Sequence, residues 1–161
     1  MESVVALSPV VAPFEATIAP HYDGLVRRLA LIVGDPEEAR DLAQTAYLPA
    51  FEAWRTFDGR DARAWLYTIG INLAINEVRR RRRLRWRSTA SEATWAMRVD
   101  PDLWSAISGL ETRHRAALLL NVLDGYTQAE IARILGVPPG TVASWLSRAK
   151  ARLRQQLREV T

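Results

Sequence analysis

TQAEIARILGVPPGTVASWLSRAKARL, residues 127–153, is the stretch that decides the fold of the second half of this chain. Thr127 is a favourable N-cap residue and Glu130 follows three positions later, which predicts a capping box at the start of a helix. Gly136 can adopt the left-handed conformation that ends this helix. An apolar stripe then recurs at spacings of four, three and four residues, formed by Val142, Leu146, Ala149 and Leu153. Two helices joined by so short a turn predict a helix-turn-helix.

The outer face of the second helix of this motif is narrow, polar and basic. It carries Thr141, Ala143, Ser144, Ser147, Arg148 and Lys150. Short side chains near the start of a helix let it enter the major groove of DNA, where arginine binds guanine edges or phosphates. The pattern therefore favours DNA binding, although a helical hairpin of any all-α protein would show the same apolar stripe.

The composition of the chain bears on several classes of function. Its 161 residues suffice for one domain or two small ones, and 48% of them are hydrophobic. There is no cysteine, which excludes disulfides and cysteine-bound zinc. His21 and His114 lie far apart without partners at ligand spacing, so we predict no metal site. The sequence has no phosphate-binding loop and no nucleophile–base pattern, so we expect neither a cofactor nor an enzymatic activity.

Nothing in the sequence predicts a membrane-spanning or secreted protein. No apolar run approaches the ~20 residues that a membrane-spanning helix needs. The N-terminus is apolar, but it begins with Glu2 and lacks the basic residues of a signal peptide. We therefore expect a cytoplasmic protein without a membrane segment of its own.

The sign of the charge alternates along the chain. The formal net charge is +4, but residues 1–57 carry −4, residues 58–87 carry +6, residues 88–111 carry −3 and residues 112–161 carry +5. Two basic blocks separated by an acidic stretch indicate two contacts with a polyanion such as DNA. The acidic stretch is then expected to join the two contacts without binding the polyanion itself.

The first half of the chain also has a helical period. Apolar residues recur from Phe14 to Gly34, and Pro20 is expected either to kink this helix or to start it. A second helix is predicted from the N-cap Asp35 to about Phe57. We expect Glu38, three positions after the cap, to complete a capping box.

A third helix is predicted from about Ala62 and ends in five consecutive arginines, Arg79 to Arg83. Its expected core face is formed by Trp65, Leu66, Ile69, Leu73 and Val78. Arginine is favoured near a helix C-terminus, but five in a row exceed any need of the helix and repel one another unless an anion is bound. A nucleic-acid contact and a solvated basic tail are the two interpretations of this run.

These patterns define the fold class and the domain organisation. No strand pattern appears, so we predict an all-α chain of two small helical domains joined by a flexible linker. The expected parts are a disordered tail of residues 1–13, a first domain of 14–87, a linker of 88–101 and a second domain of 102–161. Asp102 is expected to cap the first short helix of the second domain.

Three segments, in this order, resemble the extracytoplasmic-function (ECF) sigma factors of bacterial RNA polymerase. They are GDPEEARDLAQTAYLPAFEAW, ARAWLYTIGINLAINEVRRRR and the helix-turn-helix. The resemblance spans about residues 14–157. It implies two helical domains, known as sigma region two and sigma region four.

The resemblance also implies roles for individual residues. The first segment contains the D-L-x-Q pattern of the family helix that binds core polymerase, which implies polymerase contacts for Asp41, Leu42, Gln44 and Leu48. The second is similar to the segment that opens the downstream (−10) promoter element, which implies DNA contacts for Arg63, Trp65, Asn72, Asn76, Arg79, Arg80 and Arg83. The helix-turn-helix implies contacts to the upstream (−35) element by Thr141, Ala143, Ser144, Ser147, Arg148 and Lys150.

The leading hypothesis is therefore a sigma factor, a non-enzymatic subunit that directs core polymerase to promoters and melts DNA there. Its implied partners are core polymerase and promoter DNA, and an anti-sigma factor is left open as a third. One alternative is a stand-alone helix-turn-helix regulator, which would leave the Asp41–Leu48 face without a role. Another is a decoy that binds polymerase or an anti-sigma factor but never a promoter.

Overall fold

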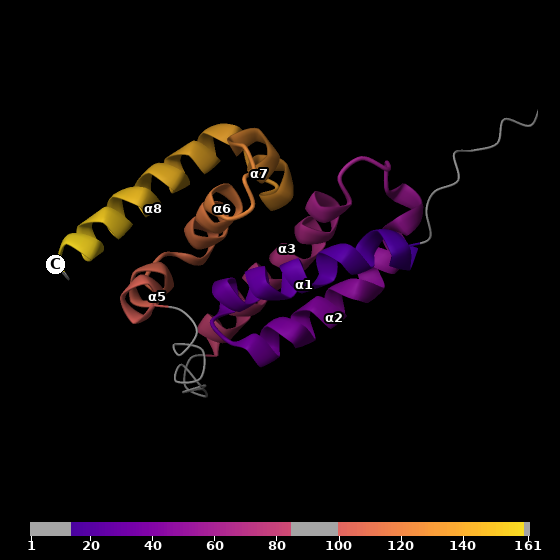
Figure 1. Ribbon diagram of the computed structural model, residues 1–161, viewed down its shortest axis with the longest axis horizontal. Helices are drawn as coiled ribbons and strands as arrows, with labels where there is room; N and C mark the ends of the chain where they lie inside the picture. Colours follow the sequence, from indigo (N-terminus) through magenta and orange to yellow (C-terminus); the bar gives the residue numbers. More distant parts are fainter. Residues whose placement is uncertain (1–13, 85–99, 160–161) are drawn as a thin grey trace, which may run out of the picture.

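The structure, a computed structural model, describes residues 14–84 and 100–159, and every regular element in these two ranges is a helix (Figure 1). The first half consists of α1 (Phe14–Val33), α2 (Pro36–Ala53), the short 3-10 helix η1 (Trp54–Thr56) and α3 (Ala62–Arg83). The second half consists of α5 (Pro101–Ser108), α6 (Thr112–Val122), α7 (Gln128–Leu135) and α8 (Pro139–Glu159). The all-α fold class is thereby confirmed. The expected disordered tail and nearly all of the expected linker lie outside the described residues.

Helix α2 begins with the predicted N-cap residue, Asp35, but the predicted capping box does not form. The Asp35 carboxylate accepts a hydrogen bond from the backbone N–H of Glu37 at 2.9 Å, and Pro36 is the first helical residue. The Glu38 carboxylate does not complete a capping box, because it pairs with the guanidinium of Arg81 on α3. A full opposite charge is a stronger partner than a backbone N–H, so the prediction for Glu38 was wrong.

The lengths of the first two helices also differ from expectation. Pro20 lies inside α1, so the helix neither begins nor ends there. Helix α2 ends at Ala53 rather than near Phe57, because the chain tightens into η1 at Trp54. Short 3-10 turns of this kind are common at the C-terminal ends of α-helices.

The buried face of α3 is not the predicted one. It consists of Leu66, Tyr67, Gly70, Ile71, Ala74 and Ile75. Of the predicted face only Leu66 is buried, while Trp65 and Ile69 are half-buried. Helix α3 packs against α1 and α2 on one side and against α6 and α7 on another, so its buried stripe is set by several neighbours at once. A Cβ atom at Gly70 would lie 2.8 Å from Leu25, which shows how closely α3 approaches α1.

The first helix of the second half starts earlier than predicted. Asp100, not Asp102, is the N-cap of α5, and its carboxylate accepts hydrogen bonds from the backbone N–H groups of Asp102 at 2.9 Å and Leu103 at 3.1 Å. Pro101 then takes the first helical position, where its missing N–H costs nothing. Asp-Pro is thus the start signal of both α2 and α5.

The helix-turn-helix is confirmed. The Thr127 hydroxyl accepts a hydrogen bond from the Glu130 N–H at 3.2 Å, and the Glu130 carboxylate accepts one from the Thr127 N–H at 2.7 Å. Gly136 ends α7 in the left-handed conformation, with φ of 65°. Helix α8 begins at Pro139, and Val142, Leu146 and Ala149 form its buried stripe.

Gly136→Ala is expected to lower the free energy of unfolding by about 1 kcal/mol, because an L-residue is disfavoured in the left-handed region. No atom lies within 4 Å of the Cβ position, so the cost is conformational and not steric. Gly140→Ala is the matched control: its Cβ position is equally open, but it lies inside α8, where alanine is neutral or stabilising. Urea unfolding of the two variants gives the comparison, and equal losses would contradict the assignment.

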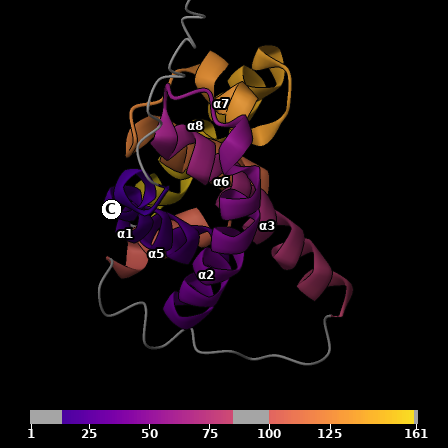
Figure 2. The same ribbon diagram turned by 90° about the vertical axis from the view of Figure 1, so that its right-hand side faces the viewer.

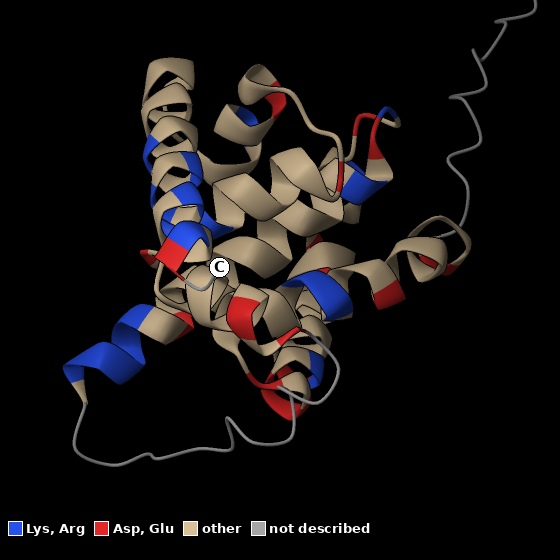
Figure 3. Cartoon of the chain, turned by 60° about the vertical axis from the view of Figure 1, so that its left-hand side comes forward, with Lys and Arg blue, Asp and Glu red and all other residues tan. Residues whose placement is uncertain are grey.

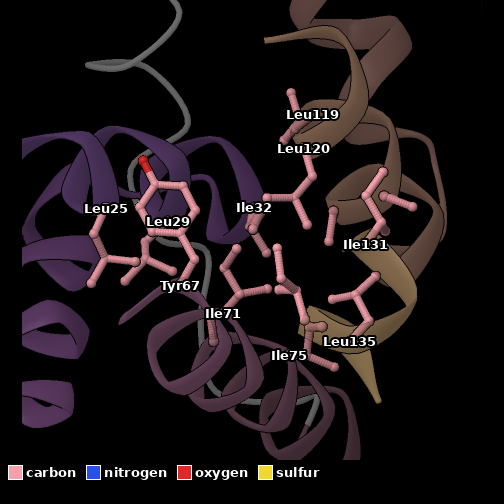
Figure 4. Close-up of a cluster of buried hydrophobic side chains, with 14 of the residues drawn as sticks. Leu25, Leu29, Ile32, Tyr67, Ile71, Ile75, Leu119, Leu120, Ile131 and Leu135 are labelled. Carbon is pink, nitrogen blue, oxygen red and sulfur yellow. The ribbon is translucent and has the colours of Figure 1, made fainter. Parts of the chain in front are cut away.

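The two halves share one hydrophobic core. Buried side chains of α1 and α3 form a continuous cluster with those of α6, α7 and α8. Figure 4 shows Ile32 of α1 between Leu120 of α6 and Ile71 of α3, and it shows Ile131 of α7 in the same cluster. Burial of such side chains is the main favourable term in folding, so the packed arrangement of the halves has its own source of stability.

Candidate nucleic-acid interface

The predicted −35 surface lies on one side of α8. Four of its six residues are exposed and two are half-buried: Ser144, Ser147, Arg148 and Lys150, then Thr141 and Ala143. Figure 3 shows Lys and Arg along the same helix. Lys150 turns toward α6, where its Nζ donates a hydrogen bond to Asn121 Oδ1 at 3.4 Å. The structure therefore presents short polar side chains and an exposed arginine together, as groove recognition requires.

The arginine run at the end of α3 forms a second basic surface. Arg79 to Arg83 are all exposed, at an end of α3 that projects from the body of the molecule (Figures 2 and 3). Glu77 accepts two hydrogen bonds from Arg80, at 2.5 and 2.9 Å, and these hold the pKa of its carboxyl below the usual value. Asn76 is exposed beside them. An exposed cluster of arginines suits the phosphate backbone of DNA.

Two other predicted −10 residues, Arg63 and Asn72, lie at the junction of the two halves. Arg63 Nε donates a hydrogen bond to the Tyr126 hydroxyl at 2.8 Å, and one of its terminal nitrogens donates one to the Asp124 carbonyl at 3.1 Å. Asn72 Nδ2 donates to the Ile134 carbonyl of α7 at 2.9 Å. Both side chains are half-buried. These two donors, to which the resemblance implied DNA contacts, are therefore engaged by the second half of the chain.

Trp65 stands in an aromatic cluster at the start of α3. Its ring lies 5.3 Å from that of Phe57 and 6.0 Å from that of Trp54. A cavity of about 410 Å³ opens beside it, lined by Thr56, Asp58, Arg60, Asp61, Ala64, Trp65, Thr68, Glu130, Arg133 and Ile134. The cavity is bounded by the turn before α3 and by α7, so both halves of the chain give it its shape.

A buried ion pair joins the halves and was not foreseen from the sequence. Arg28 of α1 donates two hydrogen bonds to the Asp124 carboxylate, at 2.7 and 2.8 Å, and both side chains are almost fully buried. One signal was present in the sequence: Arg28 interrupts the apolar stripe that includes Leu25, Leu29 and Ile32. A charge in such a stripe needs a buried partner, but nothing local identified Asp124 as that partner.

Arg115 is a second buried arginine that links the halves. Its guanidinium donates to the carbonyl of Ile32 at 2.6 Å, and to the carbonyls of Ser108 and Leu110 at 3.1 Å each. Burial lowers its pKa to about 10, which still leaves it protonated at neutral pH. The charge thus satisfies carbonyl groups at the ends of two helices, α1 and α5, where free acceptors are expected.

The predicted polymerase-binding residues fall on two sides of α2. Asp41, Gln44 and Leu48 are exposed on one face, whereas Leu42 is half-buried against the core. Leu48 is 61% exposed, and Phe51 continues the same face with 59% exposure. This exposed apolar pair is a feature that the structure adds to the predicted face. A pair of large apolar side chains beside polar ones is typical of a protein-binding surface.

The structure also bears on metal and membrane sites within the described ranges. No group of three or more His, Asp or Glu side chains there is arranged to hold a metal ion. None of the helices formed by these residues has the length and apolar character to cross a bilayer.

Comparisons with known proteins agree with this division into halves. Residues 18–84 match the family "Sigma-70 region 2", and residues 102–153 match the family "Sigma-70, region 4". The first match covers most of α1 and all of α2 and α3, and the second runs from α5 into α8.

Two characterised relatives are similar along most of the chain. ECF RNA polymerase sigma factor SigL of Mycobacterium tuberculosis is 30% identical over 152 residues, which cover 87% of this chain and 86% of SigL. ECF RNA polymerase sigma factor SigE of Mycolicibacterium smegmatis is 28% identical over 89% of this chain, which spans only 61% of the length of SigE.

A solved structure extends the similarity to three dimensions. The sigma factor RpoE of Bartonella quintana, in complex with the anti-sigma factor NepR, is similar with a TM-score of 0.75 and 26% sequence identity. The match covers 90% of this chain and 96% of that one. It therefore extends over both halves and not over one alone.

Proposed function

The chain belongs to the ECF family of RNA polymerase sigma factors, and on that premise we propose how its two halves divide the work of promoter recognition. As a sigma factor it directs RNA polymerase to promoters. We propose that it acts as a non-enzymatic specificity subunit in the cytoplasm, where the polymerase works. The observation that carries the proposal is the presence, in one chain, of an exposed recognition helix, a projecting arginine run and an exposed apolar face on α2.

The second half is proposed to bind the −35 element through α8. Its exposed face carries Ser144, Ser147 and Arg148, with Thr141 and Ala143 at the edge. The serine, threonine and alanine side chains are short, which allows the helix axis to come close to the base pairs. Arg148 is the side chain best suited to a guanine edge, because its fork can donate two hydrogen bonds to one base. Lys150 is proposed to contact phosphate once its weak bond to Asn121 is released.

The first half is proposed to bind and open the −10 element along α3. Asn72 offers a donor and an acceptor on one amide group, which suits the edge of an unpaired base. Trp65 and its aromatic neighbours offer a stacking surface, and the arginines that follow neutralise the phosphates of the separated strand. Taking a base out of the stack costs a few kcal/mol, which such contacts offset.

The exposed face of α2 is proposed to bind core polymerase through Asp41, Gln44 and Leu48, with Phe51 added by the structure. Leu42 supports this face from behind, since it is half-buried against the core. The solved RpoE structure holds an anti-sigma factor, and we propose a protein of that class as a further partner of this chain.

Leu48→Arg is expected to weaken binding to core polymerase at least tenfold without changing stability. The side chain is 61% exposed, so the fold does not need it, whereas a charge buried in an apolar interface has no compensation. Titration of fluorescently labelled protein with core polymerase measures the affinity. Leu103→Arg, at an exposed leucine of α5, is the control. Equal affinity for Leu48→Arg and the unaltered chain would rule out this face.

The proposed function as a whole is tested by transcription from sheared genomic DNA with bacterial core polymerase, with and without this protein. New transcript starts that share two spaced upstream motifs are the expected result. Binding to core without new starts would favour the decoy. Protection of a duplex site by the free protein, with no binding to core, would favour the stand-alone regulator.

A further inference from the structure

Three polar contacts cross from the first half to the second along one side of the shared core. They are the ion pair of Arg28 with Asp124, the hydrogen bond from Arg63 to Tyr126 and the hydrogen bond from Asn72 to the Ile134 carbonyl. We call these three contacts the clasp. Each donor lies on α1 or α3, and each acceptor lies in the segment from the end of α6 to the end of α7.

The acceptors of the clasp are concentrated in the short turn between α6 and α7. Asp124 uses its carboxylate for Arg28 and its backbone carbonyl for Arg63, at 3.1 Å. The Arg63 guanidinium also lies over the Tyr126 ring, 4.6 Å from its centre. Gly125 between them has φ of 72°, which gives the turn its shape. One turn of the second half therefore supplies most of the clasp.

Of the three contacts in the clasp, the Arg28–Asp124 pair is the one that water can least easily break, because its side chains are so little exposed. The side chains retain only 10% and 6% of their exposure, and both hydrogen bonds of the guanidinium fork are short. A charge that stays buried after losing its partner is strongly disfavoured, so neither side chain can leave the pair while the junction remains closed to water. Opening the halves hydrates both charges together.

In the closed arrangement the two proposed DNA-binding surfaces differ in how accessible they are. Arg63 and Asn72 are half-buried: Arg63 bonds to the turn between α6 and α7, and Asn72 bonds to α7 itself. Ser144, Ser147 and Arg148 on α8 remain exposed. The −35 surface is therefore available in the closed chain, while donors of the −10 surface are occupied.

We propose that the clasp makes this sigma factor self-occluding: the second half engages Arg63 and Asn72 of the −10 surface, and these two side chains are freed only when the Arg28–Asp124 pair separates. The proposal rests on the function proposed above for α3. Its consequence is that strand opening requires the halves to separate, whereas −35 binding does not. The free chain is then kept from opening DNA without the need for an inhibitor protein.

The fraction of molecules in the closed form determines how much the clasp weakens the binding of a partner. A partner that binds only the open form has its apparent dissociation constant raised by the inverse of the open fraction. If the open form is about a tenth of the free protein, a variant that cannot close gains about tenfold in affinity for such a partner. Core polymerase together with promoter DNA is the partner to which this applies.

Closure can be measured directly in the free, full-length protein. The chain has no cysteine, so Arg40→Cys on α2 and Gln155→Cys on α8 provide two specific positions for a donor and an acceptor dye. Both positions are exposed. We expect high energy transfer in the unaltered background and at least a twofold lower efficiency in Asp124→Arg, where two arginines face each other.

A charge swap tests whether the effect of Asp124→Arg comes from the loss of the ion pair or from another consequence of the substitution. The double variant Arg28→Asp/Asp124→Arg restores opposite charges across the junction and is expected to return the energy transfer to at least about three-quarters of the original efficiency. Glu15→Arg, on the exposed first turn of α1, makes the same change of charge elsewhere and is expected to have no effect. Equal transfer in the unaltered chain and in folded Asp124→Arg would overturn the proposal.

Folding of the variants is checked by far-UV circular dichroism, and Tyr126→Phe provides a milder test. It keeps the buried ring and removes the hydroxyl that accepts from Arg63, so it is expected to lower the transfer efficiency by a smaller amount than Asp124→Arg. If Asp124→Arg is unfolded, Tyr126→Phe and Asp124→Asn take its place as the test. No change of transfer efficiency in either of these folded variants would then overturn the proposal.

A second measurement links closure to function. Apparent affinity of labelled protein for core polymerase on the mapped promoter is expected to rise about tenfold in Asp124→Arg and to fall back in the charge swap. Opening without any gain in affinity would overturn the inhibitory role of the clasp. Failure of every form to bind core polymerase, with the energy-transfer results as expected, would instead contradict the proposed function and leave the closure established.

Discussion

Arg115→Met is expected to lower the free energy of unfolding by about 3 kcal/mol or more, because it leaves two buried carbonyl groups and one partly buried carbonyl group without this donor. Methionine has a long, unbranched, apolar side chain, so it fills much of the same space while donating nothing. The lost bonds are those to Ile32 at 2.6 Å and to Ser108 and Leu110 at 3.1 Å each. Hydrogen bonds from a charged donor are the costly ones to remove.

Urea unfolding followed by circular dichroism measures this loss. Arg133→Met is the matched control, because Arg133 is exposed on α7 and the same change of residue there removes no buried donor. The free energy of unfolding of Arg133→Met is expected to stay within about 0.5 kcal/mol of that of the unaltered chain. Arg115→Lys separates charge from geometry: lysine keeps the charge but cannot reach three carbonyls as a planar fork does, so an intermediate loss is expected. A loss below about 1 kcal/mol for Arg115→Met would contradict the structural account.

Arg115 is also expected to couple the unfolding of the two halves. One of its acceptors is the carbonyl of Ile32 at the end of α1, and the other two lie around the turn between α5 and α6. Together with the apolar cluster of Ile32, Ile71 and Leu120, this contact gives each half a share of its stability from the other. Opening of the clasp is therefore a partial separation that must leave or rebuild these contacts.

The helix starts were the most predictable part of the fold. Asp35-Pro36 and Thr127 act through groups that are neighbours in sequence, so the signal that forms the cap is also visible in the sequence. The one wrong cap, Asp102, had the correct signal two positions earlier, in Asp100-Pro101. The role of Glu38 was wrong for a different reason: its partner, Arg81, lies on another helix.

Helix faces were predictable where a helix has one neighbouring surface. The stripe of Val142, Leu146 and Ala149 on α8 was predicted correctly, and the opposite side was left for DNA. Helix α3 contacts helices on two sides, so Tyr67 and Ile75 are buried although one amphipathic stripe did not include them. Periodicity reports a single buried face and cannot describe a helix shared by two packing surfaces.

The same limit applies to the candidate site. The −35 surface follows from the periodicity of one helix, and the α2 face was implied by the resemblance to ECF sigma factors. Each set lies on a single helix, and the structure brings its members together with the exception of Leu42. The surroundings of Arg63 and Asn72 depend on contacts between residues about sixty positions apart. No local pattern specifies such a pairing, so the occupied state of the −10 donors could be found only in three dimensions.

Asn72→Ala is expected to reduce promoter opening by about tenfold or more, while leaving binding of the isolated −35 duplex unchanged. Loss of a bidentate contact to a base costs about 1–3 kcal/mol, and about 1.4 kcal/mol corresponds to a factor of ten. Asn72 lies on α3, whereas the −35 duplex is proposed to contact α8, so the second effect should be absent. Permanganate reactivity of thymines in the melted region measures opening, and a duplex binding assay measures binding to the −35 element.

The two roles of Asn72 predict effects of opposite sign, which makes the variant decisive. In the free chain its amide nitrogen donates to the Thr68 carbonyl at 2.5 Å and to the Ile134 carbonyl at 2.9 Å, so its loss weakens the clasp and favours the open form. In the promoter complex the same loss removes a base contact. On a template that is already melted, a weaker complex means that the base contact dominates, whereas a tighter complex means that Asn72 acts only through the clasp. Asp124→Asn loosens the clasp without changing any residue of α3, so its gain in affinity is the reference for a variant that acts through the clasp alone.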